Sequence, residues 1–436
     1  MAKIWNGIIE KALVVENPDL SLDRLLEAKG LSVRRLSKTP DEDGLIEEIN
    51  KHQIQVVFKR SKVQITRKII ESCPSLLAVQ LCCIGDDSID KPACAENGVM
   101  IFNDPISNGR SVVELVLGTV ISLARRLFET NQTCRVGLWE KNNTDRYEVA
   151  DKVLGIIGLG NIGRAVARLA ENLGMKINFY DTRQVSIELG KEMGWKHFDN
   201  LEDIFRASDC ITVHLSARDV KGSSNEGIFD LLHFQSLGSD RPAGPRIFIN
   251  YARGFVHTPA ALIQAIEEGY ILKAAVDVYP HEPRRGESWS NPYKDCPNVV
   301  VLPHIGASTQ EAQPRIAARV ADTFGNFTQF GAVRDTPFKV RTQLALTEQF
   351  EAGQSILIVC HSTARGTKRA IDEAIYQANV SNLSSVHKDF NEFGFAYDLA
   401  LLDGHLDEDE IKLLIRRAEE LTGREKVIFS VRQVQM

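Results

Sequence analysis

The sequence predicts an α/β protein with two doubly wound parallel sheets and a separate βαββαβ module of ferredoxin-like type at its C-terminal end. The parallel sheets are predicted from apolar runs that alternate with helical stretches over the first hundred residues, for example at 20–28, 56–58 and 77–81. Fully apolar strands separated by helices are typical of βαβ units, because helices cover both faces of such a sheet.

A second series of the same kind begins at residue 153 and contains about six candidate strands, the number in a complete dinucleotide-binding sheet. Apolar helices expected at 115–123 and 316–324 would carry the chain into this second unit and back to the first. Two crossings predict a hinge, with a ligand-binding cleft between the units. The expected strands are 153–157, 177–180, 210–215, 247–249, 274–278 and 299–302.

The segment from residue 354 to the end has its own order of elements. Its two expected helices carry apolar residues at i, i+3, i+4 and i+7, which is one buried face of a helix. A sheet covered by two helices on one side leaves its other side free to pair or to bind. The expected elements are strand 356–360, helix 368–378, strands 383–388 and 395–402, helix 408–421 and strand 427–431.

The bulk properties exclude several classes of protein. A chain of 436 residues is long enough for two or three domains, and its net charge of −6 gives no general attraction to nucleic acid or to an anionic membrane. No run of about 18 apolar residues occurs and the first 15 residues lack the pattern of a secretion signal, so we expect a cytoplasmic protein. The eight cysteines include no CxxC spacing, which predicts reduced thiols and no metal site.

Three glycines in GxGxxG spacing, Gly158, Gly160 and Gly163, follow an apolar strand and precede a helical run. Glycine is required at such a turn because the chain must reverse tightly, the backbone must approach a pyrophosphate and the helix must pack close to the strand. The start of the helix, with Asn161 and Ile162, adds free N–H groups and a positive dipole end. The motif therefore favours a dinucleotide site over a purely structural turn.

Asp181 follows the next expected strand, where a carboxylate can accept hydrogen bonds from both ribose hydroxyls of the dinucleotide. Its charge would repel the 2′-phosphate of NADP, so we expect NAD. Arg183 leaves NADP open because it could pair with that phosphate, although a solvated loop arginine is the simpler interpretation.

Three later segments each place reactive side chains directly after a strand: NYARG at 250–254, DVYPHEP at 277–283 and PHIGAST at 303–309. Ligands bind at the carboxyl ends of strands in open α/β sheets. Together with FNDPISN at 102–108, RSVVE at 110–114 and the glycine motif, these segments make residues 38–313 resemble the D-2-hydroxyacid dehydrogenase family, and within it the branch that oxidises 3-phosphoglycerate.

The resemblance implies a catalytic trio of Arg253, Glu282 and His304. Oxidation of a secondary alcohol needs a base for the hydroxyl proton, and histidine titrates near neutral pH, so His304 would be the base and, in reduction, the proton donor. Glu282 would orient the imidazole and stabilise its charged form. Arg253 offers a planar fork for the substrate carboxylate. Each residue alone also fits a structural role, but the three together beside a nucleotide fold favour catalysis.

The same resemblance implies further contacts to the cofactor. Asp277 should hold the nicotinamide carboxamide, Tyr251 and Ala252 should line the cofactor, and His214 should lie on the adenine side. The family often has proline two residues after this histidine, whereas Ser216 stands here, so we expect the insert at 217–246 to differ in shape. The remaining expected cofactor contacts are Arg253, His304, Gly306 and Ala307.

A phosphorylated acid carries about three negative charges near neutral pH, so its site needs basic groups remote from Arg253. Arg60 and Ser61 stand in a KRSKxQxT run similar to the RSRTxLT segment of the phosphoglycerate branch, and Lys141 stands in a WEK segment similar in spacing to its tryptophan and lysine loop. For each lysine a solvated surface charge is the alternative. The expected substrate-binding residues are Arg60, Ser61, Asn108, Lys141 and Lys38.

Residues 353–436 lie where several members of this branch carry an ACT domain, which binds serine at a dimer interface. The first loop of that domain reads HxNxPG, whereas this chain has His361, Thr363 and Gly366. Threonine cannot supply both the donor and the acceptor of an asparagine amide, which argues against serine inhibition. An oligomerisation role and a different effector stay open, and we expect a homo-oligomer, with a tetramer favoured.

These expectations give a flavodoxin-like substrate domain at 1–112 and 315–346, a Rossmann-type NAD domain at 113–314 and an ACT-like domain at 353–436. The predicted reaction is the oxidation of 3-phospho-D-glycerate to 3-phosphohydroxypyruvate with NAD, the first step of the phosphorylated route to L-serine. The alternatives are a dehydrogenase of 2-hydroxyglutarate, hydroxypyruvate or glyoxylate, a nucleotide-sensing protein like the family's corepressors, and a purely structural module. No nucleic acid or membrane partner is expected.

Overall fold

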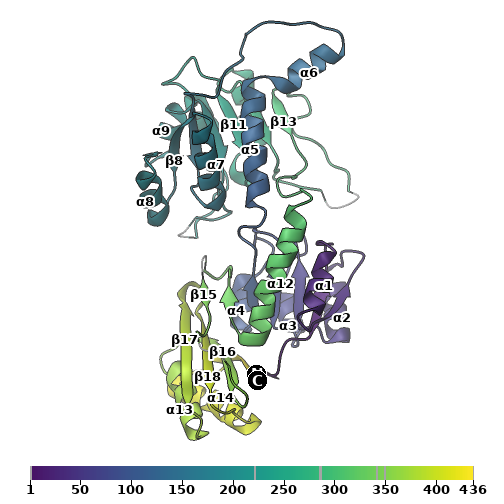
Figure 1. The fold of residues 1–436 in the computed structure, drawn as a ribbon, viewed down its shortest axis with the longest axis vertical. Coiled ribbons are helices and arrows are strands. Elements are labelled where there is room, and N and C mark those ends of the chain that lie inside the picture. The colour runs from purple at the N-terminus through teal and green to yellow at the C-terminus, as the bar shows by residue number, and fades with distance from the viewer. Residues whose placement is uncertain (1, 220–221, 284–286, 340–341, 348–349, 436) are drawn as a thin grey trace. The chain divides into compact units, whose positions relative to one another are not determined.

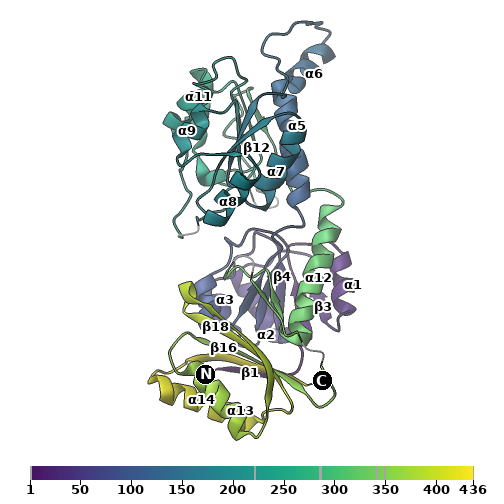
Figure 2. The ribbon, with the colours of Figure 1, turned by 60° about the vertical axis from the view of Figure 1, so that its left-hand side comes forward.

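The computed structural model describes residues 2–219, 222–283, 287–339, 342–347 and 350–435. The chain forms two compact units, one made of residues 1–107 and 313–436 and the other of residues 108–312. Both contain parallel sheets covered by helices (Figures 1 and 2), so the predicted α/β fold class is confirmed. Among the described residues, no helix is long and apolar enough to cross a membrane.

The unit of residues 108–312 contains a seven-stranded parallel sheet with the strand order β13-β12-β11-β10-β7-β8-β9. This is a doubly wound order in which the winding reverses between β7 and β10, the place where such sheets bind ligands. The six strands expected from the sequence are all present. The seventh, β9, has only two residues and so gives no apolar run. The strands are β7 (Val153–Ile157), β8 (Lys176–Tyr180), β9 (Lys196–His197), β10 (Cys210–Val213), β11 (Ile247–Asn250), β12 (Lys273–Val276) and β13 (Val299–Val301).

Helices cover both faces of this sheet. On one face α5 and α7 pack apolar residues such as Val116 and Val166 against the strands, and on the other face α9, α10 and α11 form a second core around Phe248. Helix α6 has no buried residue. The helices are α5 (Gly109–Ala124), α6 (Leu127–Arg135), α7 (Asn161–Asn172), α8 (Gln184–Glu192), α9 (Leu201–Arg206), α10 (Leu231–Ser236), α11 (Pro259–Glu267) and the 3-10 helix η1 (Gly254–Val256).

The other unit contains a five-stranded parallel sheet with the flavodoxin-like order β3-β2-β4-β5-β6. Helix α12 (Ala312–Phe330) packs on it, with the Phe324 ring 5.1 Å from the ring of Phe58. The expected return of the chain near residue 316 therefore occurs. The other elements are β2 (Lys11–Val14), α1 (Ser21–Glu27), β3 (Ser32–Arg35), α2 (Glu42–His52), β4 (Val56–Lys59), α3 (Arg67–Ser72), β5 (Ala78–Leu81), α4 (Lys91–Glu96) and β6 (Met100–Phe102).

The C-terminal module has the expected βαββαβ order and belongs to the same unit. Its sheet has the order β1-β19-β16-β18-β17, because an N-terminal strand, β1, pairs in parallel with β19. The sequence analysis did not anticipate this added strand. The elements are β1 (Lys3–Asn6), β14 (Val333–Arg334), β15 (Gln343–Leu344), β16 (Ser355–Ser362), α13 (Thr367–Gln377), β17 (Asn382–Phe390), η2 (Asn391–Phe393), β18 (Phe395–Leu402), α14 (Glu408–Thr422) and β19 (Ile428–Gln435).

The sheet face turned away from α13 and α14 is covered, so the prediction of a free face is wrong. Ile358 and Leu399 on this face belong to the same apolar core as α12. The Tyr397 hydroxyl donates to the carbonyl oxygen of Gly331 at 2.6 Å, and the buried Arg432 guanidinium donates to main-chain carbonyls at the end of α12. Every residue of β18 is buried, as expected for a strand with both faces covered.

All eight cysteines lie among the described residues, and each is a free thiol. Six of them are buried, while Cys134 is exposed. The expectation that most of the thiols lie in the core is confirmed, and their reduced state stays a prediction.

Candidate active site

The glycine motif forms the turn between β7 and α7, at the point where the sheet reverses its winding. Gly158 has φ of +96°, and a Cβ atom there would lie 2.7 Å from the carbonyl oxygen of His214. A Cβ on Gly163 would lie 2.1 Å from the carbonyl oxygen of Gly158. Helix α7 begins after Gly160, an N-cap residue that has no side chain with which to cap the first turn. The turn therefore requires glycine and offers main-chain N–H groups to an anion.

Asp181 follows β8 and is buried beside this turn. Its carboxylate accepts hydrogen bonds from the Leu159 amide at 2.8 Å and from the main chain and guanidinium of Arg183. Burial opposes ionisation, but the hydrogen bonds from Arg183 outweigh it and lower the pKa of Asp181. The interpretation of Arg183 as a solvated loop residue is wrong, because its guanidinium pairs with Asp181.

His214 and Tyr251 follow β10 and β11 at the same carboxyl edge. The main chain of His214 packs on Gly158, and burial lowers the pKa of the His214 imidazole to about 3, so this ring is neutral in the working pH range. The hydroxyl of Tyr251 lies 2.8 Å from that of Thr119 on α5, inside the core. Tyr251 therefore presents its main chain, rather than its hydroxyl, to the edge of the sheet.

Arg253 lies in a turn after β11 that two contacts fix. The Asn250 side chain donates to the carbonyl oxygen of Arg253 at 2.9 Å and accepts from the Ala252 amide at 3.1 Å. The next residue, Gly254, lies so close to Tyr279 that an added Cβ would come within 2.0 Å of its carbonyl carbon. This close packing joins the turn that carries Arg253 to the segment that leads to Glu282.

Asp277 follows β12 and holds the loop after β13. Its two carboxylate oxygens accept hydrogen bonds from the amides of Ile305 and Gly306, each at 2.8 Å. Burial raises the pKa of Asp277, against the effect of these two bonds. The carboxylate thereby fixes the main chain on the C-terminal side of His304.

His304 and Glu282 form a pair at this edge. His304 Nδ1 lies 2.8 Å from Glu282 Oε2, and the side chains are 54% and 32% exposed. The hydrogen bond from Nδ1 to the carboxylate leaves Nε2 free to take or give a proton. The Glu282 bond raises the pKa of His304, while burial and the nearby Arg253 charge oppose the rise. His304 has φ of +56°, a conformation uncommon outside glycine and often found at functional sites.

Comparisons with known proteins show the family of the chain. The profile of the family described as "D-isomer specific 2-hydroxyacid dehydrogenase, NAD binding domain" matches residues 117–306. A D-3-phosphoglycerate dehydrogenase of Haemophilus influenzae is 33% identical over 362 residues, which cover 83% of this chain and 84% of the relative. D-3-phosphoglycerate dehydrogenase 2 of Saccharomyces cerevisiae is 30% identical, covering 94% of this chain and 86% of the relative.

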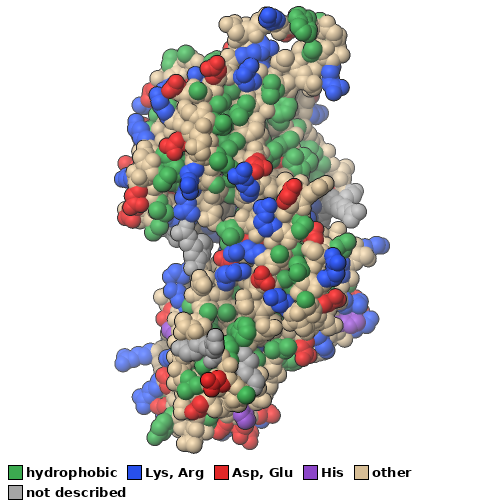
Figure 3. All heavy atoms as spheres, viewed as in Figure 1, with side chains coloured by type: hydrophobic (Ala, Val, Ile, Leu, Met, Phe, Trp, Pro, Cys, Tyr) green, Lys and Arg blue, Asp and Glu red, His purple; other side chains and the backbone are tan. Residues whose placement is uncertain are grey.

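The chain belongs to the D-isomer specific 2-hydroxyacid dehydrogenase family. It is an oxidoreductase that uses NAD. Among solved structures, D-mandelate dehydrogenase of Rhodotorula graminis matches with a TM-score of 0.66 and 24% identity, covering 77% of this chain and 99% of that one, which supports the fold. Basic and acidic side chains are interspersed on the face of this dehydrogenase drawn in Figure 3.

In the other unit of the dehydrogenase, Arg60 and Ser61 form a turn after β4 that is held from both sides. Glu16 accepts hydrogen bonds from the amides of Arg60 and Val63 at 2.6 and 2.7 Å. The buried Lys59 ammonium donates to the carbonyl oxygen of Arg60 at 2.8 Å, and burial lowers the pKa of Lys59. No ion pair to the Arg60 guanidinium occurs within the described part of the chain.

The other expected substrate ligands lie in different places. Lys38 is exposed shortly after β3, at the same carboxyl edge as Arg60. Asn108 stands directly before α5, and its buried Oδ1 has no hydrogen-bond partner among the described residues. Lys141 lies in the exposed loop after α6, at the end of its unit that holds the amino ends of the strands (Figure 1). Within one chain the structure therefore does not bring Lys141 to His304.

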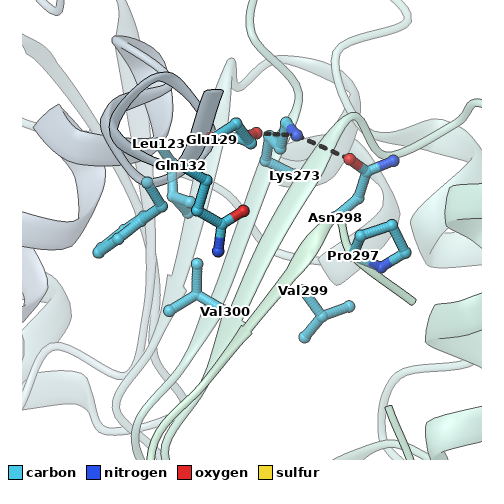
Figure 4. A pocket seen from close by; sticks show the side chains of 9 residues that line it. Leu123, Glu129, Gln132, Lys273, Pro297, Asn298, Val299 and Val300 are labelled. Atoms are coloured by element: carbon cyan, nitrogen blue, oxygen red, sulfur yellow. Dashed lines mark hydrogen bonds and ion pairs between the residues drawn. The ribbon is translucent and has the colours of Figure 1, made fainter. Parts of the chain in front are cut away.

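A pocket at this opposite end of the unit does not belong to the site. It lies beneath α6 at the amino ends of β12 and β13, where the Lys273 ammonium pairs with Glu129 and donates to Asn298 Oδ1 at 2.7 Å (Figure 4). None of the expected catalytic or cofactor residues lines it. Ligands of parallel α/β sheets bind at the carboxyl ends of strands, so we do not assign this pocket to the reaction.

Four residues that shape the site were missed by the sequence analysis: Glu16, Lys59, Asn250 and Thr119. The only signal for Lys59 was its place as a charged residue at the end of an apolar run, and the same pattern is equally typical of an exposed lysine at a strand end. Glu16 has φ of +62°, which no pattern of residue types reveals. Asn250 begins the NYARG motif, but its bonds to the turn depend on the local backbone conformation.

Proposed function

We propose that this dehydrogenase oxidises 3-phospho-D-glycerate to 3-phosphohydroxypyruvate, the first step of the phosphorylated route to L-serine. The observation that carries the substrate assignment is the Arg60 turn. Its main chain is fixed by Glu16 and Lys59 at the carboxyl edge of its sheet, and no ion pair to the guanidinium occurs among the described residues. The two relatives described above, which bear the name D-3-phosphoglycerate dehydrogenase, support the same substrate.

The residues around the glycine turn fit NAD. A Cβ would fill the space at Gly158 and Gly163, the N-cap residue of α7 is the glycine Gly160, and the ionised Asp181 lies beside the turn. These groups would hold the pyrophosphate and the adenine ribose, and Ala252, Asp277, Gly306 and Ala307 would line the nicotinamide half. When bound, NAD accepts a hydride from the alcohol carbon.

The catalytic roles follow from the hydrogen bonds at the strand ends. Nε2 of His304 takes the hydroxyl proton in oxidation and returns it in reduction, because Nδ1 is committed to Glu282. Glu282 stabilises the imidazolium that this transfer creates. Arg253 clamps the substrate carboxylate through its planar guanidinium.

The turn of Arg60 and Ser61 would select the phosphorylated substrate. Arg60 would pair with the phosphate of the substrate, and Ser61, Lys38 and Asn108 would donate further hydrogen bonds to the substrate. A phosphate contact of this kind contributes about 1.5–3 kcal/mol, or about 10- to 150-fold in apparent affinity. Cytoplasmic location and a tetramer stay predictions.

The first experiment measures NADH formation from NAD and 3-phosphoglycerate, beside NADH consumption with phosphohydroxypyruvate, hydroxypyruvate and 2-oxoglutarate. We expect the phosphorylated pair to be preferred. Arg60→Ala should raise the KM for 3-phosphoglycerate at least tenfold, whereas the control Lys51→Ala, an exposed change in the last turn of α2, should not. His304→Ala should abolish turnover and leave NADH binding nearly intact.

The outcomes separate the alternatives. Activity on unphosphorylated acids alone would remove the phosphate role of Arg60 and keep the chemistry of His304. Unchanged turnover in His304→Ala would overturn the mechanism. Silence on every substrate, with NADH still bound, would favour the nucleotide-sensing alternative.

A further inference from the structure

Three polar side chains meet on the sheet of the C-terminal module, on the face covered by α13. Asp398 of β18 lies between His361 of β16 and His387 of β17. His361 Nε2 is 2.6 Å and His387 Nδ1 is 3.1 Å from the same carboxylate oxygen, Oδ2. The side chains of His361 and Asp398 are only 2% and 3% exposed, whereas His387, on an edge strand, is 34% exposed.

The outer nitrogen of each ring also faces an acceptor. His361 Nδ1 lies 2.7 Å from the carbonyl oxygen of Ser362, and His387 Nε2 lies 3.1 Å from Asp389 Oδ1. A neutral imidazole has one N–H and one lone pair, so each neutral ring directs a lone pair at one of its two acceptors. A proton on each outer nitrogen would turn both lone pairs toward Asp398, where a cation between the rings and the carboxylate would satisfy all three groups. An outer N–H held by a carbonyl or carboxylate is typical of histidines that bind metal ions.

The net charge around this cluster is negative and would also favour a bound cation. The carboxylates of Asp398, Asp389 and Asp372 contribute three negative charges, and the Lys368 ammonium contributes one positive charge. With neutral imidazoles the sum is −2, which a divalent ion would balance. Lys368 Nζ lies 2.9 Å from Asp398 Oδ1, but no donor among the described residues makes an aligned hydrogen bond to this buried oxygen.

We propose that His361, His387 and Asp398 bind a divalent transition-metal ion of the zinc class. Two imidazoles and one carboxylate are ligands that Zn²⁺ accepts, and a fourth position would stay open toward His387 and Lys368, the exposed side of the cluster. Ligand atoms about 2.0–2.1 Å from a tetrahedral ion lie about 3.3 Å apart. The present contacts of 2.6 and 3.1 Å need to open by less than an ångström.

Such an ion would tie three strands of the module together and fix the edge strand β17. The site lies at the start of the loop between β16 and α13, the loop in which Thr363 stands where the ACT pattern has asparagine. This inference does not rest on the proposed substrate. The sequence predicted no metal because the three ligands come from three separate strands.

The test uses the full-length protein, stripped with a chelator and titrated with Zn²⁺ against a chromophoric chelator and with Co²⁺ by visible absorption. We expect one tight equivalent per chain, with d–d bands of nitrogen and oxygen ligands and without the thiolate charge-transfer band that a cysteine site would give. His387→Gln, on the exposed edge strand, should lose this equivalent. Asp389→Asn should weaken it about 10- to 100-fold.

The matched control is His405→Gln, which removes an exposed histidine of the same module outside the cluster and should bind like the unaltered protein. Circular dichroism and the Tm of the chelator-treated variants check that each has folded. The proposal is overturned if the unaltered protein binds no equivalent, if folded His387→Gln retains it, or if the equivalent disappears in His304→Gln instead.

Discussion

Replacing Glu282 by glutamine tests the central pair of the proposed mechanism, because it keeps the size of the side chain and removes its charge. The Nδ1 to Oε2 distance is 2.8 Å, for which Coulomb's law gives about 1.5 kcal/mol with the dielectric constant of water. Solvent screens this attraction, because the two side chains are 54% and 32% exposed.

The sign of the effect follows from the direction of the shift. Glu282 raises the pKa of His304. Oxidation needs the neutral imidazole, so its rate rises with pH through this pKa, and reduction needs the imidazolium, so its rate falls there. In Glu282→Gln both limbs should move to lower pH, and kcat for oxidation should fall about 10- to 100-fold because the imidazolium loses its carboxylate.

The assay is kcat and kcat/KM in both directions from pH 5.5 to 10, with the NADH Kd measured by fluorescence. Glu311→Gln, an exposed change near the same loop, is the control and should leave both limbs in place. A limb that stays fixed or moves to higher pH in Glu282→Gln refutes the reasoning. Because Glu282 raises the pKa of His304, the pair stabilises the fold at low pH, and this stabilisation is lost as pH rises through that pKa. Glu282→Gln should therefore lower the unfolding free energy by no more than about 1.5 kcal/mol, and only below that pKa.

Three further changes test other parts of the molecule. Asp181→Ala frees the Arg183 guanidinium and removes the charge that would repel a 2′-phosphate. The ratio of kcat/KM with NADP to kcat/KM with NAD should therefore rise at least tenfold. An unchanged ratio would show that Asp181 does not select the cofactor. Glu16→Ala removes the acceptor of the amides in the Arg60 turn, so KM for 3-phosphoglycerate should rise several-fold with little change in kcat; a loss confined to kcat would contradict the positioning role. Tyr397→Phe deletes one buried hydrogen bond, so urea unfolding should show a free energy of unfolding lower by about 1–2 kcal/mol. An unchanged free energy of unfolding would mean that the module does not depend on this contact.

The fold class was predictable because its signals are local. Strands covered on both faces consist of continuous apolar residues, as in 153–157 and 247–249, and helices between them show one buried face. The glycine turn was predictable for a similar reason. A Cβ on Gly163 would clash with the nearby Gly158, and Gly158 itself has a φ that other residues avoid. Likewise, the Glu282 and His304 motifs each follow a strand, and parallel strands bring their carboxyl ends to one edge.

The parts that no local pattern predicted depend on residues far apart in the chain. Strand β1 pairs with β19, near the other end of the sequence, and the second face of the C-terminal sheet is buried by α12. The strand pairing and the burial of this sheet face both depend on contacts between distant segments, which form only when the chain folds.

The sequence alone therefore determined the α/β class, the order of the strands along the chain, the glycine turn and the residue types of the proposed catalytic motifs, because periodicity and backbone conformation are encoded by neighbouring residues. Only the tertiary structure decided that Arg183 pairs with Asp181, that Glu16 and Lys59 hold the Arg60 turn, and that His361, His387 and Asp398 converge. Hydrogen bonds and ion pairs depend on distances of a few ångströms between side chains, and the packing of separate elements sets those distances.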